Sequence, residues 1–556
     1  MLRTGQQRLF WVVFLFSTVF PFILRSANPV PSVVVGQNFT GSTYGVNSSA
    51  IPPDANGAVG TRYFVEFING TFAVYNKTNH QNVKRIADTK FWSNAGVLLA
   101  TSDGITDPRV IYDPISQRWF VSMVDFDANT AGGGGDPTLE SNDFLLAVSL
   151  TSDPTGAWKG FLFQADPDTG YFADFPTLGV DSNAVYLSGD FYQGEDNPQG
   201  AGLFSFPKAD LVAATPTIAN ATWFGVMDYD QRGDVLQPAT CFDGSSVGKI
   251  LAASDIGSDS NPHSNLVCFA VQNAGSPGAT LTASTFIPTL PWVVPDNDDL
   301  GVPQFAAAQP DGTHNLIADD ARLLAKVYAV GGVLYAVQTT EFNGHLAIRW
   351  YRVHAADNTL LESGTISDPN LDLFYPSIAA NSYGVVVIGY NSSGSSALIS
   401  SYALAGQTIN GVTSFGNPLL LKAGATAYQG DDEILAELLG DPAVSRWGDY
   451  SATSVDPSDP NRFWTIQMYP SDSDVWSTQI TELITIPQIL LSIKRTGPNV
   501  VLSWPLVQGY QLQSRTNLIG LASWSNVVQS PVTNGNNLVV TVPISSGGQF
   551  FRLHSP

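Results

Sequence analysis

The sequence predicts an all-β protein: a seven-bladed β-propeller closed by an N-terminal strand and followed by a small β-sandwich. Two observations lead to this prediction. A phrase that reads strand, turn, strand returns seven times at intervals of about 50 to 90 residues, which is typical of propeller blades with loop insertions. The composition, with 50 Gly, 35 Pro, 11% aromatic and only 13% charged residues, suits short strands joined by many turns.

The clearest copy of this phrase runs from Asp107 to Val124. It reads as a strand that ends at Asp113, a turn, and a second strand that begins at Trp119. The other copies keep the same order: a small residue or proline, four mostly apolar residues, Asp or Asn, a turn and an apolar strand. The copies at Ala55 and Ala325 have Gly60 and Val330 in place of the Asp or Asn. The small or proline position falls at Ala55, Pro108, Pro176, Pro238, Ala325, Pro376 and Ser451. Because an alternating third strand follows each copy, each copy predicts one blade.

The closure of the ring is predicted from the two ends of this pattern. The last copy reaches Pro487 before a clear fourth strand, whereas Val33–Phe39 has no partner of its own. We predict that Val33–Phe39 is the outer strand of the seventh blade, because closure removes exposed edge strands. The copy at Ala325 is the weakest, since its register could slide to Asp320–Arg322. The alternative fold, a β-sandwich with evenly spaced turns, does not require one internal order seven times.

Three segments are predicted along the chain. Residues 1–27 form a signal peptide, residues 28–486 the propeller and residues 487–556 the β-sandwich. The signal peptide is indicated by Arg3 and Arg8, which precede an uncharged and almost wholly apolar run over residues 9–24. An uncleaved anchor is the alternative, but the run is short for a membrane span, which needs about 20 residues. We expect a secreted or cell-surface protein without a stable membrane span after cleavage.

The formal net charge of −23 limits the partners that the protein can bind. Such a field repels nucleic acid and anionic lipid headgroups. It is compatible with neutral polymers, cationic groups or bound Ca²⁺. An extracellular glycan or protein is therefore the expected partner, and the sequence does not indicate an oligomeric state.

Three phrases are similar to those of a known group of proteins: PPDANGAVG at 52–60, DPRVIYDPISQRWFVS at 107–122 and RWGDYSATSVDPSDPNRFW at 446–464. They resemble secreted bacterial seven-bladed propellers of the sialidase-like or BNR-like type, a group without one agreed activity. Sialidases carry Asp-box turns of the form Ser-x-Asp-x-Gly-x-x-Trp, and no stretch here fits. No sialidase catalytic residue is therefore assigned. The tail, with YQLQSRTNL at 510–518, resembles a β-sandwich appended to exported bacterial proteins, which implies attachment or sorting.

Several carboxylates lie near the start of the predicted first strands. They are Asp54, Asp107, Asp174, Asp320 and Asp449. Because first strands line the channel of a propeller, these side chains could form a ring at one mouth and bind Ca²⁺ or a cationic group. The alternative is turn and cap chemistry, in which each carboxylate accepts hydrogen bonds from nearby backbone amides.

Arg109, Arg322 and Arg446 occupy similar places. A guanidinium group presents a planar fork that suits carboxylates, so converging arginines could hold an acidic sugar. The alternative is pairing with an Asp of the same motif, such as Asp107 or Asp320. A glycosidase would need two facing carboxyl groups roughly 5–9 Å apart. With 48 acidic residues, the sequence cannot single out such a pair.

Other motifs give little chemistry. Asp166 and Asp168 have the spacing of half a Ca²⁺ loop, but a distal Glu is missing and a solvated loop is the alternative. The six His residues form no metal-spaced cluster, and no G-x-S-x-G or Walker motif is present. Cys241 and Cys268 are expected on the first and third strands of one blade, roughly 9–10 Å apart, which is too far for a disulfide bond. We expect two buried thiols.

These observations favour an exported, non-catalytic binding or surface-interaction protein that recognises a glycan or protein and needs no cofactor, although Ca²⁺ could bind. The alternative is a carbohydrate-active enzyme, a glycoside hydrolase or lyase, that works at the mouth of the channel. Three internally paired arginines would favour the first hypothesis. Three arginines that converge on one open funnel would favour the second.

Overall fold

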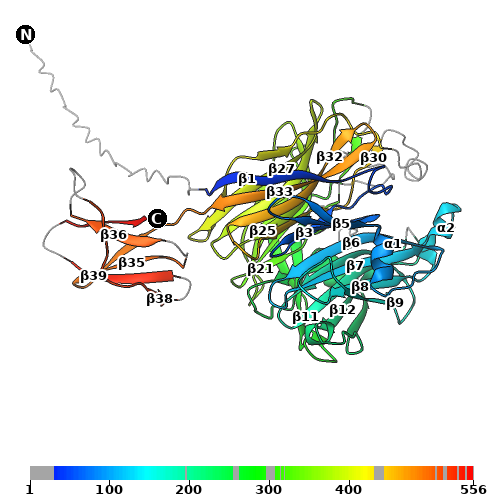
Figure 1. Ribbon diagram of the computed structural model, residues 1–556, viewed down its shortest axis with the longest axis horizontal. Helices are drawn as coiled ribbons and strands as arrows, with labels where there is room; N and C mark the ends of the chain where they lie inside the picture. Colours follow the sequence, from blue (N-terminus) through cyan, green and yellow to red (C-terminus); the bar gives the residue numbers. More distant parts are fainter. Residues whose placement is uncertain are drawn as a thin grey trace, which may run out of the picture.

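The computed structural model is a seven-bladed β-propeller followed by a small β-sandwich (Figure 1). It describes residues 30–554 except 195–196, 255–261, 296–306, 313–314, 319, 431–443, 507–509, 517–522, 535–536 and 545–547. The predicted signal peptide lies outside these residues. In the described part of the chain, no helix is long and apolar enough to cross a membrane.

The first four blades follow the chain in order. Blade 1 contains β2 (Asn56–Val59), β3 (Tyr63–Ile68), β4 (Thr71–Asn76) and β5 (Asn82–Ile86). Blade 2 contains β6 (Asp103–Asp113), β7 (Arg118–Asp127), β8 (Asp143–Ser149) and β9 (Trp158–Gln164). Blade 3 contains β10 (Phe172–Val180), β11 (Ala184–Tyr192), β12 (Pro198–Pro207) and β13 (Thr222–Met227). Blade 4 contains β14 (Asp234–Pro238), β16 (Lys249–Ala253), β17 (His263–Gln272), β18 (Thr280–Leu281) and β19 (Thr285–Trp292).

The remaining three blades complete the ring. Blade 5 contains β21 (Tyr328–Val330), β22 (Val333–Phe342), β23 (His345–His354) and β24 (Thr359–Ile366), and β15 (Thr240–Cys241) joins it. Blade 6 contains β25 (Asp372–Ala380), β26 (Val385–Gly394), β27 (Ala397–Ile409), β28 (Val412–Phe415) and β29 (Leu419–Lys422). Blade 7 contains β31 (Ala452–Val455), β32 (Arg462–Asp472), β33 (Val475–Ile486) and β1 (Ser32–Thr43). The predicted strand pairs of all seven copies are therefore confirmed.

A few short elements lie between the blade strands. The pair β20 (Asn315–Ile317) and β30 (Val444–Arg446) is parallel. The helices are α1 (Asp88–Asn94), α2 (Ala128–Gly132), the 3₁₀ turn η1 (Pro137–Leu139), α3 (Lys208–Leu211) and α4 (Tyr229–Arg232).

The placement of Cys241 corrects one expectation. Cys241 lies on β15, which pairs in parallel with β21 of blade 5, whereas Cys268 lies on β17 of blade 4. The chain leaves blade 4 after Ala239, whose amide still donates to the Lys249 carbonyl, and the Thr240 amide donates to the Val327 carbonyl, 2.8 Å away. Both cysteines are buried free thiols, and burial raises the pKa of each thiol to about 11.

The predicted closure of the ring is confirmed. β1 pairs antiparallel with β33, from Ser32 opposite Ile486 to Thr43 opposite Ser477, and lies beside it in Figure 1. The strand is longer than the predicted Val33–Phe39. Since β1 is the outer strand of blade 7, the first described strand and the last strand of the propeller share one sheet.

A buried carboxylate holds this closure. Glu66 on β3 is fully buried and accepts hydrogen bonds from Ser42 of β1, Tyr75 of β4 and Thr478 of β33. Arg85 donates to the Ser42 and Tyr75 hydroxyls beside it, both at 2.6 Å. Three strands from two blades thus meet on one carboxylate, and its burial is tolerable because every contact is a donor.

The recurring Asp or Asn of the repeat has a double structural role. Each of these side chains caps the turn after its first strand, as Asp113 does for the Ile115 amide at 3.0 Å. Each also reaches the next blade. The contacts are Asp113 to Lys208, Asp181 to the Gly248 amide, Asp243 to the Gly331 amide, Asn381 to the Pro460 carbonyl and Asp456 to Lys77. The repeat is therefore a set of clips between blades.

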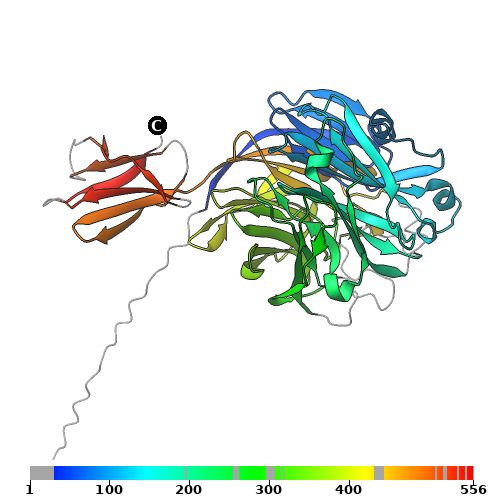
Figure 2. The same ribbon diagram turned by 90° about the horizontal axis from the view of Figure 1, so that it is seen from below.

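The tail is built from two small sheets. One contains β34 (Ser492–Thr496), β35 (Asn499–Pro505), β39 (Asn537–Pro543) and β38 (Val532–Asn534), and the other β36 (Gln511–Arg515), β37 (Ser525–Asn526) and β40 (Phe550–His554). Leu502, Trp504, Leu512, Val540 and Val542 form its core. Figure 2 shows the tail to one side of the propeller, joined to it after β33.

Replacement of Glu66 by alanine should destabilise the ring. The change leaves the buried donors of Ser42, Tyr75 and Thr478 without their shared acceptor, so we expect a loss of about 3 kcal/mol in the free energy of unfolding. Urea unfolding would measure it, with the exposed Glu140→Ala as control. Equal midpoints for wild type and Glu66→Ala would contradict the role given to this carboxylate.

Candidate functional site

The first strands β2, β6, β10, β14, β21, β25 and β31 lie around the channel, and the clips hold the turns at one end of it. We call the end at which these strands begin the upper mouth and the opposite end the lower mouth. The predicted carboxylates and arginines lie at the upper mouth or just below it.

Three predicted carboxylates come together at the upper mouth. One oxygen each of Asp54, Asp107 and Asp449 lies within 4.8 Å of the others. Asn69 orients two of them, since its Nδ2 donates to Asp54 at 2.8 Å and its Oδ1 accepts from the Asp107 amide at 3.0 Å. Asp54 and Asp107 are buried, whereas Asp449 is half-buried. Oxygen ligands in this arrangement are those that Ca²⁺ prefers.

The backbone directs these side chains toward the channel. Five of the first strands have a non-glycine residue with positive φ near their start, at Asp54, Asp107, Phe175, Val235 and Tyr375. Four of these positions coincide with a register shift against the second strand. Such residues cost about 1–3 kcal/mol each, so the rest of the blade must hold them in place. A β-bulge of this kind re-aims the side chains at the end of a strand.

The carboxyl groups at the upper mouth hold their protons unusually tightly. Burial, together with repulsion from Asp174 and Asp449, raises the pKa of Asp107 to about 7. Burial and the same kind of repulsion raise the pKa of Asp54 well above its usual value. Asp190, which lies opposite Asp174 in the sheet of blade 3, has its pKa raised to about 6, mainly by burial.

Two of the three arginines pair with the Asp of their own motif. Arg322 lies 2.6 Å from Asp320 and also contacts Asp190 at 3.0 Å. Arg446 lies 2.6 Å from Asp449. Asp190 was not indicated by the sequence, because it lies on the second strand β11 rather than at the start of a first strand.

Arg109 behaves differently from the other two. It is only 3% exposed, and it donates from Nε to the Pro176 carbonyl at 2.7 Å and from Nη1 to the Leu324 carbonyl at 3.1 Å. Its Cζ lies 3.4 Å from the ring centroid of Tyr450. Arg109 of blade 2 therefore contacts blades 3 and 7 and the segment that leads into blade 5. Its ion pair with Asp107, one of the alternatives from the sequence, is not formed, and the geometry favours a structural role.

The half Ca²⁺ loop closes on itself. The Asp166 carboxylate accepts hydrogen bonds from the amides of Asp168, Thr169 and Tyr171. Asp168 accepts one from Trp223 Nε1 at 3.0 Å. Turn chemistry therefore accounts for the Asp166 carboxylate, whereas the contact of Asp168 comes from a side chain of β13.

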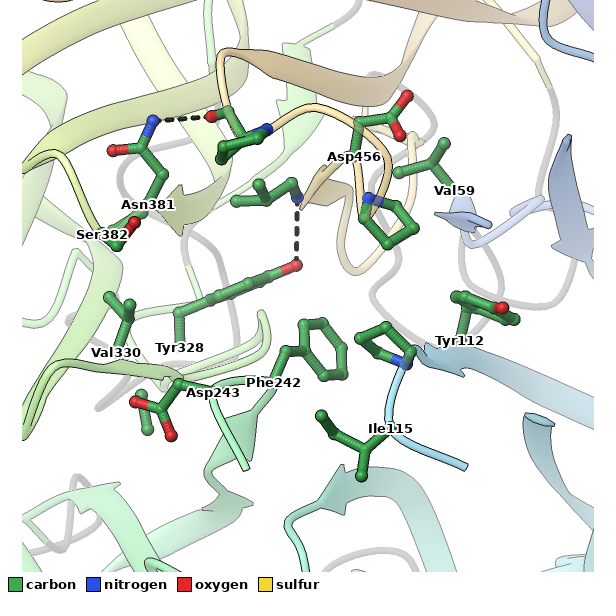
Figure 3. Close-up of a pocket in the computed structure, with 16 residues that line it drawn as sticks. Val59, Tyr112, Ile115, Phe242, Asp243, Tyr328, Val330, Asn381, Ser382 and Asp456 are labelled. Atoms are coloured by element: carbon green, nitrogen blue, oxygen red, sulfur yellow. Dashed lines mark hydrogen bonds between the residues drawn. The ribbon is translucent and has the colours of Figure 1, made fainter. Parts of the chain in front are cut away.

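The lower mouth contains a cavity that sequence reasoning missed (Figure 3). Its volume is about 350 Å³, and Tyr112, Phe242 and Tyr328 line it together with several prolines. Two of its polar side chains are used in hydrogen bonds within the propeller: Asn381 donates to the Pro460 carbonyl, and the Tyr328 hydroxyl accepts from the Val455 amide. The cavity therefore suits an apolar group. The prolines in the turns after the repeated Asp were the one available signal.

No protein-family model and no curated protein matches the chain. Solved structures with a similar fold include a protein of unknown function from Dyadobacter fermentans, with 11% identity, 70% of this chain and 96% of that chain covered, and a TM-score of 0.37. An α-L-arabinanase from Penicillium chrysogenum matches with 10% identity, 81% and 98% coverage and a TM-score of 0.34. A sialidase from Trypanosoma rangeli matches with 10% identity, 79% and 53% coverage and a TM-score of 0.28. Likenesses this distant carry no inference about activity, which has to come from the side chains of this chain.

The raised pKa of Asp107 predicts a pH dependence of stability. The unfolded chain loses this proton near its usual pKa of 3.8, whereas the folded protein keeps it up to about pH 7. The folded state binds more protons between these values, so stability falls as pH rises from 4 to 7. In Asp107→Asn the side chain stays neutral, and urea midpoints at pH 5 and pH 8 should differ less than in wild type. The exposed Asp153→Asn is the control and should keep the wild-type difference between the two midpoints. An equal difference in wild type and Asp107→Asn would contradict the raised pKa of Asp107.

Replacement of Arg109 by methionine tests its structural role. The change leaves the buried carbonyls of Pro176 and Leu324 without donors, so we expect a loss of about 2–4 kcal/mol in the free energy of unfolding. Urea unfolding of Arg109→Met and of Arg118→Met, whose guanidinium bonds only its own turn, would compare the two arginines. If both variants lost a similar amount of free energy of unfolding, the contacts of Arg109 would not be needed for stability, and its role would have to be functional.

Proposed function

We propose that the protein is an exported, non-catalytic binding protein that recognises a neutral or cationic part of a glycan or protein at the upper mouth. The observation that carries this proposal is the pair of partly exposed ion pairs there, Arg322 with Asp320 and Arg446 with Asp449. Side-chain exposures of 20, 23, 28 and 16% leave their edges accessible. Paired groups present donors and acceptors at fixed positions, which suits hydroxyl or amide recognition.

The charge at the upper mouth supports a ligand that is not acidic. Six carboxyl groups gather there, from Asp54, Asp107, Asp174, Asp190, Asp320 and Asp449. Three guanidinium groups lie close to them, from Arg109, Arg322 and Arg446. Since Arg322 and Arg446 already have acid partners, a sialylated or uronic ligand would have to compete with Asp320 and Asp449 for their guanidinium groups. It would also meet repulsion from each carboxyl group of the mouth that has lost its proton. Export and attachment through the tail belong to the same proposal and rest on the sequence pattern.

A carbohydrate-active enzyme is the second candidate, and one observation favours it. Asp107 and Asp449 come within 4.8 Å, close to the separation of roughly 5 Å at which retaining glycosidases place their two carboxyl groups. With its pKa raised to about 7, Asp107 could supply a proton near neutral pH. Its burial, and the ion pair that occupies Asp449, favour binding over catalysis.

A glycan array scored for binding and for released product tests the two candidates. For neutral or amino glycans that bind, Arg322→Gln and Arg446→Gln should each weaken affinity by about tenfold or more, which is about 1.4 kcal/mol. Arg462→Gln is the matched control, because Arg462 pairs with Asp459 and Glu482 on blade 7 away from the mouth. Binding restricted to acidic glycans, or unchanged by both mouth variants, would overturn the proposal. Release of any sugar would support the enzyme instead.

A further inference from the structure

Two cationic side chains meet in the middle of the channel, below the acidic upper mouth. Arg109 of β6 donates to the Leu324 carbonyl on the segment that leads into β21. Lys326, two residues farther along that segment, donates from Nζ to the Val110 carbonyl of β6 at 2.6 Å. The two side chains thus cross between the same two segments in opposite directions. Their charged ends are close enough that Arg109, in addition to burial, lowers the pKa of Lys326 to about 7.

The donors of this pair are only partly used. Arg109 is 3% exposed, and its Nη2 is buried without a hydrogen-bond partner. Lys326 has three N–H donors, and Val110 accepts one of them. Among the ion pairs formed by described residues, none includes Arg109 or Lys326. A buried guanidinium donor without an acceptor is costly and uncommon in folded proteins.

We propose that a small monovalent anion, of the chloride type, binds between Arg109 and Lys326 in the channel. While Lys326 is protonated, a water molecule between the two groups would accept a hydrogen bond but would not offset their two like charges in surroundings of low polarity. A larger polyanion does not fit beside the rings of Tyr450 and Phe175, whose centroids lie 3.4 and 4.9 Å from Arg109 Cζ. The site lies just below the binding surface proposed at the upper mouth, and its own groups have the opposite charge.

The lower mouth offers a route for this ion. Lys326 is half-buried, so part of its side chain remains accessible to solvent. Tyr328 and Tyr112, which line the cavity of the lower mouth, come two residues after Lys326 and Val110. On a strand, two residues correspond to roughly 6.6 Å, so the lining of the cavity begins about that far below the cationic pair. The upper mouth, with its carboxyl groups, would repel the same ion.

The experiment uses the propeller with its tail, two halides and gluconate as the control anion. Crystals of wild type soaked in sodium bromide should show an anomalous peak within hydrogen-bonding distance of both Arg109 Nη2 and Lys326 Nζ. Thermal melting in sodium chloride should give a Tm about 2 °C or more above that in sodium gluconate of equal ionic strength, because an ion that binds only the folded state stabilises it. Lys326→Met should lose this difference, and Lys159→Met, on the outer strand of blade 2, should keep it.

Two outcomes would overturn the proposal. Bromide peaks confined to the surface, with water between Arg109 and Lys326, would mean adventitious ions only. A chloride effect of equal size in wild type and Lys326→Met would place the effect elsewhere. If Lys326→Met does not fold, the bromide peak in wild type decides the question alone. A failure here leaves glycan binding at the upper mouth untouched, since that test uses Arg322 and Arg446.

Discussion

Closure of the ring is the constraint on which the rest of this structure depends. Each blade buries its faces against its neighbours only, so an open array would expose two apolar faces and the edge of β33. Glu66 stabilises the closure because it binds Ser42 and Thr478, which lie near the two ends of the propeller sequence, through one carboxylate of blade 1. The clip from Asp456 to Lys77 acts at the same joint, and those from Asp113, Asp181, Asp243 and Asn381 act at four others. Only a closed ring gathers the starts of the first strands at one mouth.

The closed channel changes character along its axis. Along β6 the chain passes from Asp107 at the acidic mouth, through Arg109 in the middle, to Tyr112 beside the apolar cavity. The segment into β21 repeats this order with Asp320, Lys326 and Tyr328. Carboxyl groups therefore lie at one end of the channel, the two cationic groups in the middle, and aromatic rings at the other end. Arg109 has two roles in this arrangement. Its guanidinium group joins blade 2 to blade 3 and to the segment before blade 5, and its positive charge lies just below the carboxyl groups of the upper mouth.

Much of this fold could be predicted from the sequence, because a repeat with one internal order leaves few architectures. Closure by the N-terminal strand followed from an unpaired strand at one end and a missing strand at the other. The group of Asp54, Asp107 and Asp449 followed from the position of all three at the start of first strands. What could not be predicted depends on packing between blades. The carbonyl partners of Arg109 come from other blades, Asp190 reaches the mouth from a second strand, and Cys241 crosses to blade 5. The cavity of the lower mouth joins turns that no single repeat contains.

The position of the tail gives the two mouths different surroundings. A second hollow is lined by Tyr335 and Arg352 of blade 5 and by Pro505 and Leu506 of the tail, and it shares Asn381 with the cavity of the lower mouth. The tail thus stands on the side of the lower mouth. If the tail attaches the protein to a cell envelope, as we propose, the propeller is held with its apolar opening toward that surface. The acid-lined opening then points outward, where a polymer in the surrounding medium would meet it first.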